Sequence, residues 1–213
     1  DMINKAMCDN IRKAVATAEV HTSGEIVCVI TKSSARYAMF PLFWAALIAL
    51  LLPALNGLAA LQGHTDPVVT FPLQTFAFLA LSGLFLLSPL RTKVTPRAVR
   101  VNNCRRSALE QFFAQNLHKT ADRTGILFYV SVDEKYVDCI ADKGINDKVG
   151  KNGWDAIVSS FVTHIQDNKI EQGFISAIND CKEILARHFP AGANKTNELP
   201  DHLVEVPASS FLS

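Results

Sequence analysis

Three carboxylates border the apolar runs that predict β-strands in this sequence. Glu25 opens the first run, Asp122 precedes the second, and Asp142 follows the third. Because strand ends in an open α/β sheet converge on a shared crevice, we expect these side chains to lie near one another. Carboxylate oxygens are preferred ligands of Ca²⁺ and Mg²⁺. The pattern therefore predicts a candidate divalent-metal site formed by Glu25, Asp122 and Asp142.

Structural roles compete with this interpretation, and we favour them. Asp122 can pair with Arg123 or cap a turn, and Asp142 can shape the turn that it forms with Lys143 and Gly144. The sequence alone leaves both interpretations open.

Recognised phosphatase machinery is missing from the sequence. Glu110 stands where a Cys-x5-Arg loop would place its arginine after Cys104, and the histidines are isolated along the chain. The segment 144–151 departs from a phosphate-binding loop in its spacing, and Asn152 replaces the serine or threonine that would hold magnesium. No catalytic residue is predicted.

The elements that position the carboxylates follow from hydrophobic patterning. Residues 25–31 and 126–132 are continuously apolar, which predicts strands covered on both faces, whereas residues 136–141 alternate and predict a half-exposed antiparallel strand. Apolar spacing of three and four predicts four helices, within residues 3–20, 101–117, 154–165 and 170–185. Helices on both sides of a small mixed sheet predict an α/β fold of the α/β/α sandwich type.

A two-helix transmembrane hairpin is expected to interrupt this sandwich. Residues 39–61 and 68–90 carry no charged residue, and each stretch exceeds the roughly 20 apolar residues that a membrane-spanning helix needs. We therefore divide the chain into a first part of the domain (1–38), the hairpin (39–90), the remainder of the domain (91–190) and an extended tail (191–213).

Cations flank the expected hairpin on one side. After it come Arg91, Lys93, Arg97, Arg100, Arg105 and Arg106. The positive-inside rule places both flanking segments on the cytoplasmic face of a bacterial inner membrane, or on the matrix face of a mitochondrial inner membrane. The same cations predict contact with the headgroups of the lipid bilayer, at about 1 kcal/mol each, although setting the topology would explain them equally well.

Composition narrows the partners and the compartment. The formal net charge is +1, which argues against a nucleic-acid partner. Five dispersed cysteines without a CxxC pair are typical of reduced thiols in a cytosol-like compartment.

Several motifs in a specific order resemble the TPM-domain family, in the short bacterial branch in which two membrane helices interrupt the domain. They are TSGEIV at 22–27, DRTGIL at 122–127, ADKGI at 141–145, WD at 154–155, RHFP at 187–190 and NELPDHL at 197–203. The resemblance implies an α/β/α sandwich. It also implies either a phosphatase label with divalent-metal binding, or an accessory role in membrane assemblies.

Two functions remain after these observations. We favour a membrane-anchored, non-catalytic accessory or assembly subunit, whose partners are the bilayer and the subunits of a larger membrane protein complex. The alternative is a membrane-anchored phosphatase that depends on a divalent metal, Ca²⁺ or Mg²⁺. Whether the protein is an enzyme stays open at this point, and the absence of a nucleophile arrangement favours the accessory role.

Overall fold

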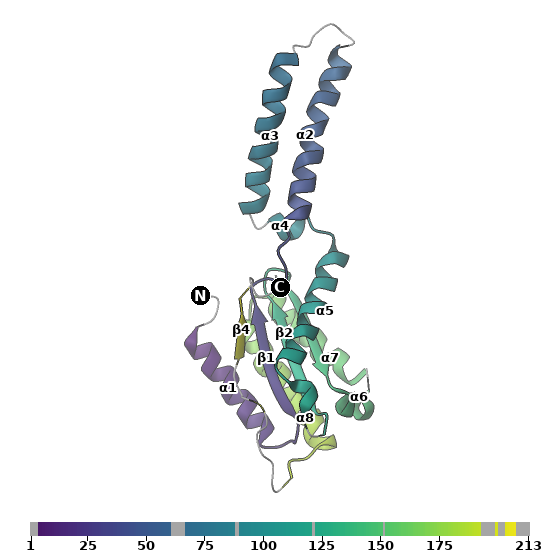
Figure 1. Cartoon of the computed structure of the whole chain (residues 1–213). Coiled ribbons are helices and arrows are strands. Elements are labelled where there is room, and N and C mark those ends of the chain that lie inside the picture. The colour runs from purple at the N-terminus through teal and green to yellow at the C-terminus, as the bar shows by residue number, and fades with distance from the viewer. Residues whose placement is uncertain are drawn as a thin grey trace. The chain divides into compact units, whose positions relative to one another are not determined.

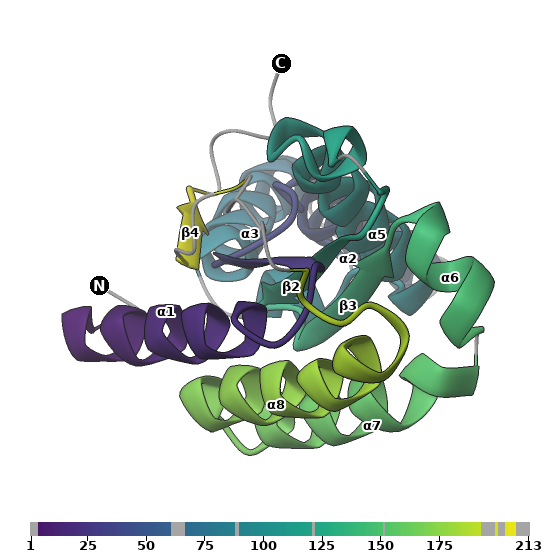
Figure 2. The ribbon, with the colours of Figure 1, turned by 90° about the horizontal axis from the view of Figure 1, so that it is seen from below.

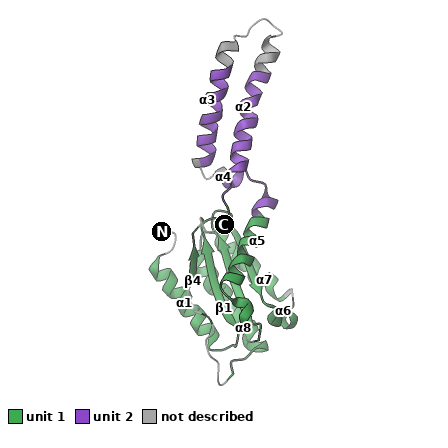
Figure 3. Ribbon diagram, viewed as in Figure 1, with its two compact units in different colours: residues 1–35, 101–213 green, residues 36–100 purple. Residues whose placement is uncertain are grey.

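The structure is a computed structural model in which the chain forms two compact units, residues 1–35 with 101–213 and residues 36–100 (Figure 3). It describes residues 4–60, 67–87, 90–120, 122–150, 152–192, 199 and 203–207. The predicted division of the chain at residues 38, 90 and 190 stays a prediction.

A mixed β-sheet organises the first unit. In the described part of the chain it has four strands in the order β3-β2-β1-β4. The central strands β1 (Glu25–Thr31) and β2 (Gly125–Ser131) are parallel, and β3 (Tyr136–Ala141) runs antiparallel to β2. Every residue of β1 and β2 is buried, as their continuous apolar sequences predicted.

The fourth strand was missed in the sequence. Strand β4 (Leu203–Val206) pairs in parallel with β1 and lies within the segment that we expected to be an extended tail. Four residues are too short to show a clear alternation, so the pairing with β1 supplies what the pattern did not.

Helices cover both faces of the sheet, which gives the expected three layers. Figure 2 shows α1 (Lys5–Glu19), α7 (Asn152–Gln166) and α8 (Ile170–His188) on one side and α5 (Arg97–Ala114) on the other. Two apolar cores result, because alternate residues of β1 point to opposite faces: Cys28 joins the α8 side and Val29 the α5 side.

Two short helices complete this unit. The 3₁₀ turn η1 (Leu117–Lys119) precedes β2, and α6 (Lys143–Val149) follows β3. Asp142 caps α6, since its side chain accepts a hydrogen bond from the Lys143 amide. The predicted turn at this position is therefore the first turn of a helix.

The second unit contains α2 (Met39–Ala60), α3 (Pro67–Leu87) and the single turn α4 (Leu90–Lys93). Helices α2 and α3 pack side by side (Figure 1). They form the helical hairpin that the uncharged stretches predicted.

The prediction that this hairpin crosses a membrane is wrong by the structure. Within the described residues, no helix combines the length and the apolar character that a crossing requires. The uncharged stretch 68–90 overestimated the second helix, because α3 ends at Leu87 and a separate turn begins at Leu90.

Candidate functional site

Strand register brings the three predicted carboxylates to the same end of the sheet. Glu25 pairs with Gly125 across β1 and β2, and the Asp142 amide donates to the Gly125 carbonyl at 2.9 Å. Asp122 lies in the loop just before β2 and is exposed. This is the amino end of the parallel strands, however, whereas ligand crevices of open α/β sheets lie outside the carboxyl ends.

The Arg123 guanidinium forms an ion pair with the Asp142 carboxylate. Its Nε lies 2.6 Å from Oδ2 and its Nη2 lies 3.0 Å from Oδ1, which is a two-point contact. The Lys143 amide adds a third hydrogen bond, to Oδ1 at 2.7 Å. The hydrogen bond and charge of Asp142 raise the pKa of Arg123. Asp142 is therefore a buried structural anchor, and it pairs with Arg123, which we had considered as a partner for Asp122.

Glu25 is also buried, with 1% of its surface exposed. Its Oε2 accepts a hydrogen bond from the Leu199 amide at 3.3 Å. The neighbouring Glu19 accepts from the Ile26 amide at 2.7 Å. These two carboxylates fix the start of β1 to segments on either side of it.

We predicted that Glu25, Asp122 and Asp142 would hold a Ca²⁺ or Mg²⁺ ion, but their contacts do not fit such an ion. Across the described ranges, no three His, Cys, Asp or Glu side chains are grouped so that they could hold a metal. A cation at Asp142 would have to displace the Arg123 guanidinium, which already bonds both oxygens. We therefore derive no metal chemistry at this end of the sheet, and the assignment of Glu25, Asp122 and Asp142 as ligands stays a prediction.

A buried polar cluster lies at the opposite end of the parallel strands, and sequence reasoning missed it. The Tyr129 hydroxyl lies 2.9 Å from Ser34 Oγ and 2.7 Å from Ser107 Oγ. Glu134 accepts hydrogen bonds from Ser33 Oγ and from the Ser34 amide, both at 3.0 Å. The only sequence signal was the placement of polar residues among apolar ones.

The hydroxyl groups of this cluster bond to one another, to Cys104 and to Glu134, and to no histidine in the hydrogen bonds described for them. Burial raises the pKa of Tyr129, so its phenol stays protonated near neutral pH. Ser34 and Ser107 both hydrogen-bond the phenol, and Ser34 also donates to Cys104 Sγ. The cluster is a clamp that holds the end of β1 against β2 and α5.

Two of the predicted membrane-surface cations form ion pairs, one with the buried Asp138 and one at the surface. Arg105 contacts Asp138 at 3.1 Å, and Arg106 contacts Glu110 at 2.9 Å, one turn along α5. Lys93 and Arg97 are exposed and Arg100 is half-buried, whereas the Arg91 side chain lies outside the described residues. The predicted contact with lipid headgroups stays a prediction.

The second unit presents an unusual amount of apolar surface. Met39 and Phe43 on α2 are 82% and 60% exposed, and Phe71 and Phe76 on α3 are 69% and 71% exposed. Other exposed apolar side chains on these helices are Leu42, Trp44, Leu47, Ile48, Leu50, Leu51, Leu73, Leu79, Leu84 and Leu86.

Comparison with known proteins supports the resemblance inferred from the motifs. The family model of the TPM domain matches residues 91–184. The chain is similar to the NMR structure of the BA42 protein from the psychrophilic bacterium Bizionia argentinensis, with a TM-score of 0.61, 19% sequence identity and 97% of each chain covered. At that identity the likeness shows the fold alone. No curated protein matches the sequence.

Proposed function

Residues 91–184 are a TPM domain, and from this premise we propose that the protein is a non-catalytic accessory subunit of a larger membrane protein assembly. The apolar surface of α2 and α3 is its docking surface. The occupant that we propose is a set of apolar helices of a partner subunit.

The exposed apolar side chains of α2 and α3 carry this proposal. Phe71 and Leu73 are 69% and 49% exposed, yet they lie on roughly opposite sides of α3 because each residue turns a helix by about 100°. Ile48 and Leu50 show the same relation on α2. A helix that is apolar all round is normally buried, so the contact between α2 and α3 leaves most of this surface to be covered.

The chemistry of the docking surface selects an apolar partner. The described parts of α2 and α3 contain no charged residue, and one buried hydroxyl, that of Ser82, has no hydrogen-bond partner within the described structure. Packing and occasional side-chain hydrogen bonds join apolar helices of this type. A polar or charged partner surface would leave the apolar side chains of α2 and α3 without apolar contacts.

Native mass analysis after gentle detergent extraction tests the proposal. We expect a defined assembly heavier than the chain. The variant Phe76→Gln should weaken that assembly, whereas Phe113→Gln, at an exposed phenylalanine of α5, should leave it intact. A monomer in every detergent tested would contradict the accessory role.

The phosphatase alternative has weaker support. It rests on the family label and on the carboxylates, but Asp142 is already paired with Arg123. Metal-stimulated hydrolysis of a phosphate ester, lost in Asp122→Asn or Asp142→Asn without loss of folding, would establish it. Equal hydrolysis by these variants and the parent would exclude the proposed site.

The basic segment supports a proposal about the location and the bilayer contact. We propose that Lys93, Arg97 and their neighbours contact anionic headgroups at an inner membrane, bacterial or mitochondrial, because clustered cations are attracted to such surfaces. Cell fractionation with a salt wash tests this contact, and complete recovery in the soluble fraction at low salt would contradict it.

A further inference from the structure

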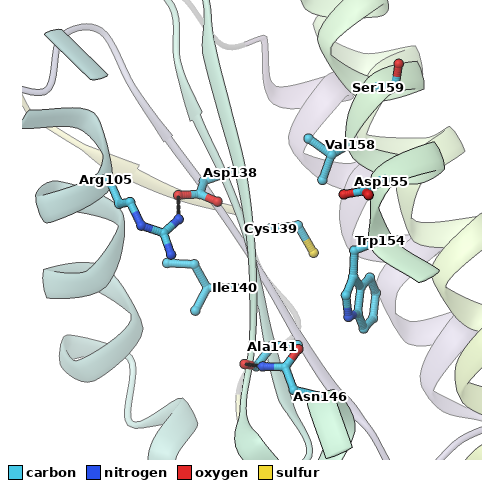
Figure 4. A pocket seen from close by; sticks show the side chains of 10 residues that line it. All are labelled: Arg105, Asp138, Cys139, Ile140, Ala141, Asn146, Trp154, Asp155, Val158 and Ser159. Carbon is cyan, nitrogen blue, oxygen red and sulfur yellow. Dashed lines mark hydrogen bonds and ion pairs between the residues drawn. The ribbon is translucent and has the colours of Figure 1, made fainter. Parts of the chain in front are cut away.

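A groove of about 710 Å³ lies beside β3, the edge strand of the sheet. Figure 4 shows its lining, which includes Arg105 of α5 on one side, Cys139 of β3, and Trp154, Asp155 and Val158 of α7 on the other. All of these residues belong to the first unit. The groove is therefore formed within the first unit alone.

The edge of β3 turns backbone groups towards this groove. The hydrogen bond from the Asp142 amide to Gly125 sets the alternation of the ladder, in which every second residue of β3 pairs with β2. Val137, Cys139 and Ala141 then point their amides and carbonyls outward. Asn146 confirms this direction, because its Nδ2 donates to the Ala141 carbonyl at 2.6 Å.

The outer edge of β3 has no neighbouring strand among the described residues. Cys139 and Val137 therefore offer a short ladder of donors and acceptors between two helices. An extended peptide uses this kind of edge when it adds a strand to a sheet.

Trp154 provides a second and independent indication of a ligand. Only 7% of its surface is exposed, and its Nε1 is buried without a hydrogen-bond partner in the described structure. Figure 4 shows the indole nitrogen turned towards β3. Buried indole donors usually have a partner, and a backbone carbonyl of an added strand would supply one.

The charged residues that line the groove indicate which side chains a bound segment would carry. Arg105 and Asp138 neutralise each other at 3.1 Å, and the Tyr136 hydroxyl also donates to Asp138. Asp155 is exposed at the rim and leaves the lining with an excess negative charge. Val158 and the Trp154 ring beside it are apolar. A strand that presents one basic and one apolar side chain towards α7 would match both.

We infer that this groove binds an extended segment of a partner protein, which pairs with the outer edge of β3 and directs a lysine or arginine towards Asp155. Trp154 donates a hydrogen bond to its backbone, and Val158 contacts its apolar side chain. This inference goes beyond the accessory role and does not depend on the docking of α2 and α3.

The probe is a blocked peptide of sequence Thr-Leu-Thr-Lys-Thr-Leu-Thr, titrated into the whole chain by calorimetry. As an extended strand it places leucine and lysine on one face. We expect saturable binding, and at least fivefold weaker binding when glutamate replaces the lysine. Absence of binding, or equal binding of the glutamate peptide, would overturn the inference.

Two N-methylated versions of the peptide test the strand pairing itself. One is methylated at its leucines and lysine, the other at its threonines. Residues of one of these sets must face β3, so at least one version should lose binding. Retention of binding by both versions would show that no strand is added, and it would overturn the proposal without affecting the α2 and α3 docking.

Variants of the protein locate the contact. Cys139→Pro removes an outward amide and keeps the ladder to β2, so it should weaken binding at least tenfold while the thermal midpoint stays close to that of the parent. Asp155→Lys should weaken the lysine peptide at least fivefold, whereas Asp180→Lys, at an exposed carboxylate of α8, should have no effect. Equal binding by Asp155→Lys and Asp180→Lys would overturn the assignment of the groove.

Hydrogen exchange of backbone amides is measured on the parent protein, so it tests the proposal even if the proline variant misfolds. In the parent protein, the Val137 and Cys139 amides should exchange more slowly when the peptide is bound. Unchanged exchange at both positions under saturating peptide would place the peptide elsewhere and reject the proposal.

Discussion

Both units of this chain contain helices, but the units differ in what covers the apolar side chains of those helices. In the first unit, α1 and α8 carry polar residues on one face and bury the other against the sheet. In the second unit, α2 and α3 expose large apolar side chains on more than one side. The comparison shows that the first unit buries the apolar faces of these helices within itself, whereas the second leaves large apolar side chains exposed.

The polar groups show the same difference. In the first unit, buried carboxylates at the sheet end are hydrogen-bonded by backbone amides and by Arg123. These contacts stabilise the fold, since a buried polar group costs free energy unless it is paired. The described parts of α2 and α3 hold no charged group, so contacts of that kind cannot stabilise their surface.

The largest expected difference between the units lies in the removal of a phenyl ring. Phe174 is fully buried, with its ring 5.0 Å from that of Phe161, whereas Phe76 on α3 is 71% exposed. Phe174→Ala should lower the free energy of unfolding of the first unit by about 3–5 kcal/mol, because it leaves a cavity. Phe76→Ala should change the free energy of unfolding of the second unit by less than about 0.5 kcal/mol. Urea denaturation measures both, and similar losses would remove the distinction between the units.

Two helical glycines give a smaller effect of opposite sign. A Cβ at Gly144 would lie 2.4 Å from the Asp122 carbonyl oxygen, which is backbone and cannot move aside, whereas a Cβ at Gly83 of α3 meets no atom within 4 Å. Gly144→Ala should therefore destabilise the first unit by about 1–3 kcal/mol. Gly83→Ala should increase the stability of α3 by up to about 1 kcal/mol, because alanine favours a helix.

Thermal unfolding followed by circular dichroism measures the glycine variants against the parent. A lower midpoint for Gly83→Ala would mean that another chain packs closely on α3 in the sample. A neutral Gly144→Ala would mean that the loop before β2 is less fixed than its contacts indicate.

Several parts of this fold could be predicted from the sequence because their patterns are local. The continuous apolar runs of β1 and β2 and the spacing of α7 and α8 each match the structure. The TPM domain is likewise confirmed over residues 91–184. Strand β4 could not be predicted, since it is short and its pairing with β1 and its packing in the cores join segments that are distant in sequence.

The candidate site was harder to predict for a physical reason. Strand order placed Glu25, Asp122 and Asp142 at one end of the sheet, but sequence patterns do not reveal how side chains pair. Arg123 adopts a positive φ of 55° and reaches Asp142, so the guanidinium takes the place proposed for a metal. The prediction of a membrane crossing rested on the absence of charge alone, and no helix within the described residues meets the combined requirement of length and apolar character.

Tyr129 tests how strongly the first unit depends on its buried polar cluster. Tyr129→Phe removes hydrogen bonds to Ser34 and Ser107 and should cost about 1–2 kcal/mol. Burial raises the pKa of Tyr129 above that of an unfolded tyrosine, near 10. The unfolded chain therefore loses its proton first, and stability should fall as the pH rises above about 10. Denaturation at pH 8 and pH 11 measures this loss, which should be smaller in Tyr129→Phe.

The smallest expected effect concerns binding rather than folding. Lys93 is exposed in the second unit, and Lys5 is exposed on α1 in the first. If the second unit is the one that meets a partner surface, Lys93→Gln should weaken binding to phosphatidylserine vesicles by about 1 kcal/mol, and Lys5→Gln should not. Neither change should alter the unfolding midpoint, since an exposed lysine contributes little to stability. Vesicle sedimentation at low salt measures the binding of both variants. Equal effects of Lys93→Gln and Lys5→Gln would show a general charge attraction instead of a contact made by the second unit.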